Sequence, residues 1–90
     1  MVFVPIRIEE YLKLHLKANP GENATQFLSR LRQCVCDAVA GAQCQCGALI
    51  WTIGSASAGH ACFTCITGES FPDGGYEIDE VIRAKYNQYD

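Results

Sequence analysis

The chain has 90 residues and a formal net charge of −3 at pH 7, with a sequence pI near 5.2. Hydrophobic residues make up 49% and charged residues 19%, a balance that excludes the composition of a disordered chain. The length predicts one domain over residues 1–90, small enough that a metal or disulfide cross-link would add substantially to its stability. The acidic balance gives no reason to expect a polyanionic partner.

The first ten residues, MVFVPIRIEE, contain no basic leader and only a short apolar stretch. They do not have the pattern of a signal peptide, and no apolar run approaches the roughly 18 residues that a membrane span requires. We therefore expect a cytoplasmic protein with no membrane partner, in which the six cysteines stay reduced. Clustered cysteines in that compartment more often bind metal than pair. Three disulfides in a secreted domain are the alternative.

Two helices are expected in residues 1–41, the predicted helical part of the chain. Residues 8–18, IEEYLKLHLKA, are rich in helix formers, with glutamates early and lysines late, as the helix dipole favours. Residues 24–40 carry apolar side chains every three or four positions, which indicates an amphipathic helix. Asn23 is its expected N-cap, and Gly41 is well placed to end it.

Two close pairs of cysteines follow, Cys44 and Cys46 in CQC and Cys62 and Cys65 in CFTC. The 15 residues between Cys46 and Cys62 are enough for two short strands and a turn, which would bring the pairs together. A structural zinc ion takes four soft ligands in a tetrahedron, with Zn–S distances of about 2.3 Å. The spacing therefore predicts one structural Zn²⁺ held by Cys44, Cys46, Cys62 and Cys65.

The stretch 44–65 resembles the zinc-ribbon family, whose usual pattern is two CxxC turns about 15–20 residues apart. CFTC matches that pattern, whereas CQC is one residue short, which implies a distorted first turn or a different ligand set. His60 is the alternative metal ligand, in a set that leaves out Cys44 or Cys46. The whole chain also looks like small bacterial-type proteins that join a helical N-terminus to a four-cysteine ribbon, a similarity that implies no activity.

The predicted fold class is α+β. Two N-terminal helices pack on a zinc-stabilised antiparallel β-hairpin within a zinc-ribbon-like part at 42–71, and a short C-terminal helix closes the domain. Residues 48–53, ALIWTI, favour the first strand, 54–59 a turn, and the return strand would begin near His60. The part at 72–90 is expected to be a loop followed by a helix over 78–89, where apolar residues have helical spacing.

The other two cysteines lie on the second predicted helix. Cys34 falls on its apolar stripe and is expected in the core. Cys36 lies about 200° further around the helix, so the two cannot chelate one ion together.

An enzyme is not expected. A zinc hydrolase needs an open coordination position and a general base, and the sequence contains neither H-x-E nor H-E-x-x-H. A thiol-redox pair at Cys62 and Cys65 would need a helix after it, whereas Ile66-Thr67-Gly68 predicts strand and turn. Nucleic-acid binding is disfavoured because no lysine or arginine occurs between Arg32 and Arg83.

These observations predict a small zinc-binding protein whose four-cysteine site is structural and whose surface binds another protein. Aromatic residues of the second half, such as Trp51 and Phe63, can supply that surface or can pack the hairpin against the second helix. The alternative is a thiol-redox or zinc-responsive protein that uses the same cysteines.

Overall fold

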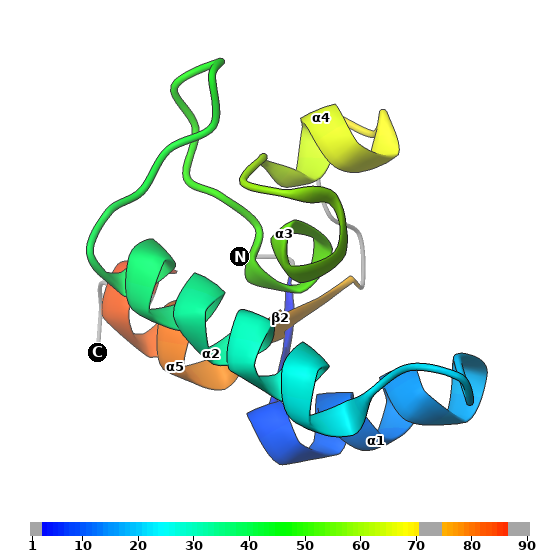
Figure 1. Ribbon diagram of the computed structural model, residues 1–90. Coiled ribbons are helices and arrows are strands. Elements are labelled where there is room, and N and C mark those ends of the chain that lie inside the picture. The colour runs from blue at the N-terminus through cyan, green and yellow to red at the C-terminus, as the bar shows by residue number, and fades with distance from the viewer. Residues whose placement is uncertain (1–2, 71–74, 87–90) are drawn as a thin grey trace.

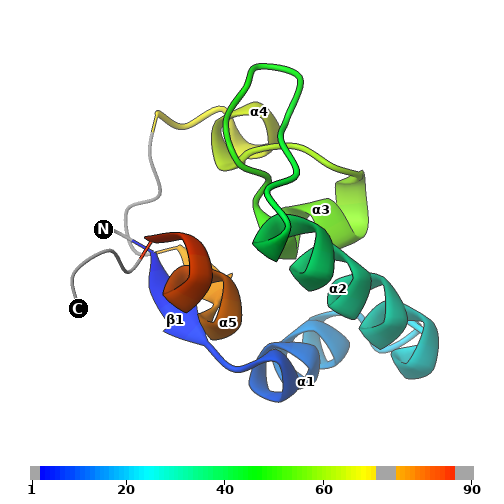
Figure 2. The same cartoon turned by 90° about the vertical axis from the view of Figure 1, so that its left-hand side faces the viewer.

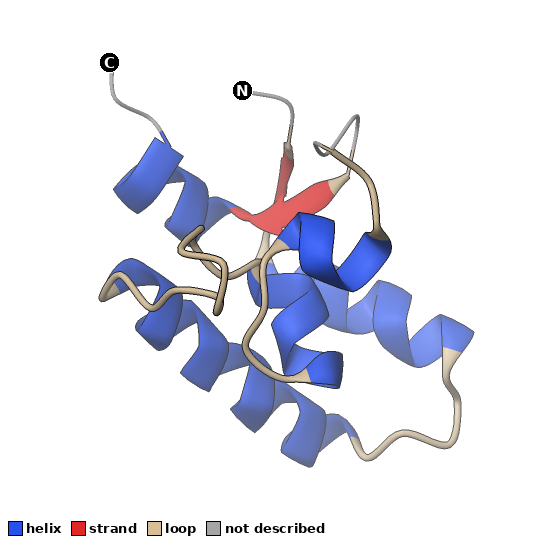
Figure 3. Ribbon diagram, turned by 90° about the horizontal axis from the view of Figure 1, so that it is seen from above, coloured by secondary structure: helices blue, strands red, loops and turns tan. Residues whose placement is uncertain are grey.

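A computed structural model describes residues 3–70 and 75–86 of the protein. Most of this part is helical, and its strands form one small sheet (Figures 1 and 3). In chain order the elements are β1 (Val4–Ile6), α1 (Ile8–Ala18), α2 (Ala24–Val39), α3 (Thr52–Ala58), α4 (Phe63–Thr67), β2 (Tyr76–Ile78), α5 (Asp79–Val81) and η1, a π-helix (Ile82–Tyr86).

The sheet joins the beginning of the chain to its last quarter. β1 and β2 are parallel, with Val4 opposite Tyr76 and Ile6 opposite Ile78. Each strand leads into a helix: β2 continues directly into α5, and only Arg7 separates β1 from α1. The sheet therefore fixes where both of those helices start.

Helix α2 is the element on which the others pack, and α1, α3 and α5 all contact it (Figures 1 and 2). It begins as predicted, because the Asn23 side chain accepts a hydrogen bond of 2.9 Å from the backbone N–H of Gln26. Its apolar stripe is buried, since Phe27 and Leu31 have no exposed surface and Cys34 is 6% exposed. The predictions of the first two helices and of a core position for Cys34 are confirmed.

The predicted α+β fold with an antiparallel hairpin is wrong. Helix α3 takes up the last two residues of the expected first strand and most of the expected turn, and helix α4 forms where the return strand was expected to end. Residues 48–51, the rest of the expected first strand, form neither a strand nor a helix. Burial explains the difference, because the buried side chains of α3 are spaced as one face of a helix. Most of them are small, which allows α3 to pack closely on α2. The buried residues of α3 are Thr52, Ile53, Ser55 and Ala56.

The C-terminal helix was expected over residues 78–89. It starts one residue later as α5 and continues as the π-helix η1 to Tyr86. The predicted positions after Tyr86, and most of the predicted loop at 72–75, lie outside the described residues. Among the helices of the described ranges, none is long and apolar enough to cross a lipid bilayer.

Candidate metal centre

The first cysteine pair sits in a tight turn between α2 and α3. The backbone N–H of Cys44 donates to the carbonyl of Ala48 at 2.7 Å, and that of Gly47 donates to the carbonyl of Cys44 at 2.9 Å. Gly47 has a φ of +96°, which a residue with a side chain rarely adopts. The turn rises from the end of α2 toward the side of the molecule where α4 lies (Figures 1 and 2).

The second pair lies at the start of α4. Cys62 is the N-cap of this helix, and its sulfur accepts a hydrogen bond of 3.4 Å from the backbone N–H of Cys65. The segment before Cys62 is fixed to the start of α3. The carbonyl of Ala61 accepts hydrogen bonds from the backbone N–H of Trp51 at 2.9 Å and from the Ser55 hydroxyl at 3.1 Å. Helix α3 thus holds the second pair opposite the first.

These two segments bring all four predicted cysteines together. The sulfurs of Cys44, Cys46, Cys62 and Cys65 lie within 4.8 Å of one another, and those of Cys46 and Cys62 are 3.5 Å apart. Sulfurs at the corners of a tetrahedron around zinc would be about 3.8 Å apart, given a Zn–S distance of about 2.3 Å. The group therefore has the size and the donor atoms of a four-coordinate metal site.

The four sulfurs differ in their access to solvent. Cys44 and Cys62 are buried, at 7% and 5% exposure, whereas Cys46 and Cys65 are exposed. Each pair thus contributes one buried and one exposed cysteine. A metal ion in the group would face protein on one side and solvent on the other.

The four thiols also affect one another's ionisation. The backbone amides of Cys46 and Cys62 favour the Cys44 thiolate and lower its pKa to about 6. The sulfurs of Cys44, Cys62 and Cys46 raise the pKa of Cys65 to about 12. For Cys46 the Ala48 amide favours the thiolate, but the sulfurs of Cys62 and Cys44 together raise its pKa. A cation among the sulfurs would offset this mutual repulsion and let all four ionise.

His60, the alternative ligand, is outside the group of sulfurs. Its Nε2 lies 2.9 Å from Oδ2 of Asp37 near the end of α2. This contact joins α2 to the segment that leads into Cys62. No sequence pattern indicates this role of Asp37, because only the fold brings residues 37 and 60 together.

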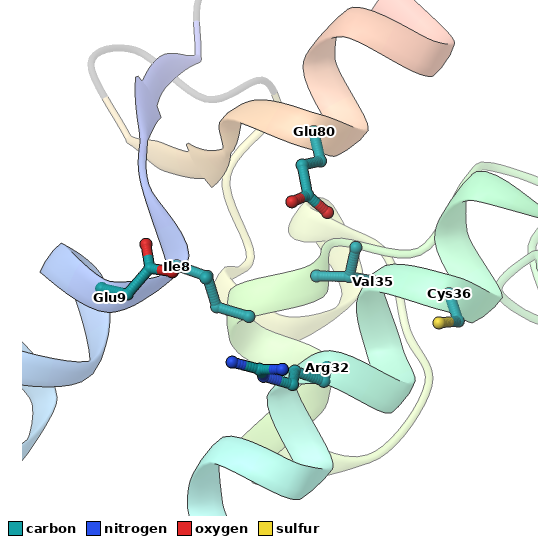
Figure 4. Close-up of a pocket in the computed structure, with 6 residues that line it drawn as sticks. All are labelled: Ile8, Glu9, Arg32, Val35, Cys36 and Glu80. Carbon is teal, nitrogen blue, oxygen red and sulfur yellow. The ribbon is translucent and has the colours of Figure 1, made fainter.

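Cys34 and Cys36 are also outside the group. Cys34 lies in the core, where burial raises the pKa of its thiol, and Cys36 is exposed on α2. Cys36 lines a separate pocket of about 330 Å³ between α1, α2 and α5 (Figure 4). There the apolar Ile8 and Val35 lie between Arg32 and Glu80, and the four clustered cysteines do not contribute.

No family model, curated protein or solved structure matches the chain. The resemblance to zinc ribbons is therefore carried by the four cysteines alone. Their clustering is as expected, but the antiparallel hairpin that defines a ribbon is absent from the described residues. A turn and a short helix N-terminus present the sulfurs instead.

Proposed function

We propose that the protein binds one Zn²⁺ through Cys44, Cys46, Cys62 and Cys65, and that this ion is structural. The observation that carries the proposal is the grouping of four sulfurs within 4.8 Å, contributed by two segments that are distant in the sequence. Four thiolates form a soft donor set of the kind that zinc takes in closed structural sites.

The role of the ion is to hold the turn at 44–47 against the start of α4. The hydrophobic core runs from β1 through α2 and α3 to α5, and none of the four cysteines belongs to it. The turn itself is closed mainly by its own backbone hydrogen bonds and the bridge between Gln43 and Leu49. A metal would therefore link a peripheral turn to a core that forms from other residues.

The test is metal analysis of protein purified under reducing conditions without added metal. We expect one zinc per chain. Cys44→Ser should lose it, because removal of a ligand costs more than the about 10–100-fold in affinity that loss of an outer-shell partner costs. Cys36→Ser is the matched control, since it removes a thiol outside the group, and should retain the zinc. Iron with visible absorbance, or no metal at all, would contradict the proposal.

Zinc should also stabilise the fold, because an ion that binds only the folded chain adds free energy of unfolding by mass action. At a free concentration of 100 times Kd this amounts to about 2.7 kcal/mol. Thermal unfolding with and without a chelator measures the difference. An equal midpoint under both conditions would mean that the ion does not support the fold.

A second function is favoured by one observation. Helix α4 follows Cys62 directly, so the sequence-based objection to a thiol-redox pair, that strand and turn follow it, does not hold. A redox protein of this kind would stay folded without metal and would cycle between dithiol and disulfide at Cys62 and Cys65. Zinc analysis separates the two functions, because a tightly held ion occupies both of those sulfurs.

A further inference from the structure

The four-cysteine group has two features that would allow it to react with oxidants. Two of its residues, Cys46 and Cys65, are exposed to solvent. One of these, Cys46, is 3.5 Å from a buried sulfur of the opposite segment, Cys62. Exposed thiolates are the ones that oxidants reach, and a second thiol close by captures the oxidised sulfur.

We infer that hydroperoxides release the metal by forming a disulfide between Cys46 and Cys62. This inference rests on the proposed function, since it concerns the regulation of the same zinc site. The exposed Cys46 is the sulfur attacked first, and the buried Cys62 is the one that completes the bond. The oxidised protein exchanges one cross-link between the two segments for another.

The chemistry balances with hydrogen peroxide as the oxidant. The Cys46 thiolate attacks one peroxide oxygen, the O–O bond breaks, and Cys46 becomes a sulfenic acid as hydroxide leaves. The Cys62 thiolate then attacks that sulfur, the S–S bond forms, and a second hydroxide leaves. The two sulfurs lose two electrons in total, which the peroxide accepts. Zinc keeps its charge and dissociates because two of its four ligands are gone, and Cys44 and Cys65 take up protons from water.

The fold allows this exchange without unfolding. The disulfide would join the turn at 44–47 to the N-cap of α4, the same two segments that the zinc joins. None of the four cysteines is among the residues of the main core cluster. The helices should therefore persist after oxidation, while the zinc is lost.

The experiment treats zinc-loaded Cys36→Ser protein with hydrogen peroxide in the presence of a chromophoric zinc chelator. The Cys36→Ser background removes the exposed thiol outside the group. The metal content before peroxide is added tests the proposed function by itself, so a protein without zinc is recognised at that step. We expect one zinc released per disulfide formed, with the helical circular dichroism unchanged.

Chymotrypsin, without prior reduction, then identifies the bond. Cleavage after Trp51 and Phe63 places Cys46, Cys62 and Cys65 on three different peptides, although Cys44 remains on the peptide of Cys46. Trypsin cannot do this, because no lysine or arginine lies between Arg32 and Arg83. Fragmentation of the linked peptides in a mass spectrometer then distinguishes a bond at Cys46 from one at Cys44. A Cys46–Cys62 peptide pair supports the inference. A Cys62–Cys65 or Cys44–Cys46 bond overturns it, and so does zinc that stays bound in excess peroxide.

Discussion

The carboxylate of Glu77 accepts a hydrogen bond of 3.0 Å from the backbone N–H of Thr52, the first residue of α3. Its other oxygen accepts one of 2.9 Å from the N–H of Ile78. Trp51, the N-cap of α3, makes no side-chain cap of its own. Glu77 therefore provides from strand β2 the acceptor that a helix N-terminus requires, and it is completely buried while doing so.

Burial raises the pKa of Glu77 to about 7 from an ordinary value of 4.5, although the Thr52 and Ile78 amides partly oppose this. An acid with a raised folded pKa contributes stability that is complete below the unfolded pKa and is lost as pH rises through the folded one. From Glu77 alone we expect the free energy of unfolding to fall by up to about 3 kcal/mol between pH 4.5 and 7.

Urea unfolding at several pH values in chelator and reductant measures this effect, with Glu77→Gln as the comparison. The comparison with Glu77→Gln is necessary because Cys44, whose pKa is lowered to about 6, changes the free energy of unfolding in the opposite direction. The stability that the Cys44 thiolate contributes is lost as pH falls through about 6. Glu77→Gln should remove the downward slope that Glu77 causes. Parallel curves for the two proteins would show that Glu77 does not titrate in this range.

The same contact shows why the sequence predicted only part of the fold. The first two helices follow from local information: a cap at Asn23 and apolar residues at helical spacing through 24–39. Helix α3 depends on a cap 25 residues away in the chain, at Glu77, which no local pattern contains. Its small residues at 54–58 matched a turn equally well, although the buried positions have the i, i+3, i+4 spacing of a helix.

The grouping of the four cysteines was more predictable than the fold around it. Cysteine spacing selects the four sulfurs, because two short turns can bring four donors together in several folds. Spacing does not say whether strands or helices carry the turns. That choice depended on the packing of α3 on α2 and on Cys62 acting as the N-cap of α4, neither of which the sequence pattern revealed.

Gly54 on α3 has no room for a side chain. A Cβ added there would lie 2.5 Å from Cε3 of Trp51 and 2.7 Å from Cδ1 of Ile66. Gly54→Ala gains about 1 kcal/mol of helix propensity but incurs overpacking, which typically costs about 1–3 kcal/mol, so we expect net destabilisation. Because Ile66 lies on α4, the substitution should also weaken zinc binding.

Gly21→Ala is the matched control for Gly54→Ala, since a Cβ at Gly21 would meet nothing within 4 Å. Thermal unfolding and zinc affinity of the two variants give the comparison. Equal thermal-unfolding midpoints for the two variants would show that the Trp51 and Ile66 side chains move aside without a cost in stability.

Two leucines test where the core lies. Leu31 on α2 has no exposed surface, whereas Leu14 on α1 is 46% exposed. Leu31→Ala should lower the free energy of unfolding by about 2–5 kcal/mol through lost burial and the cavity left behind. Leu14→Ala removes the same atoms from an exposed position and should change the free energy of unfolding by no more than about 0.5 kcal/mol. Urea unfolding measures both, and comparable losses would contradict the packing described for α2.

His60 tests which residues bind the proposed metal ion. His60 and Cys62 are two residues apart, yet the His60 ring contacts Asp37 and lies outside the group of sulfurs. His60→Ala should therefore keep one zinc per chain, and loss of the partly exposed contact with Asp37 should lower stability by at most about 1 kcal/mol. Cys65→Ser, a substitution at another exposed position, should lose the zinc. If His60→Ala lost the metal while Cys44→Ser or Cys46→Ser retained it, the ligands would be three cysteines and His60, and the contact with Asp37 would have to break when zinc binds.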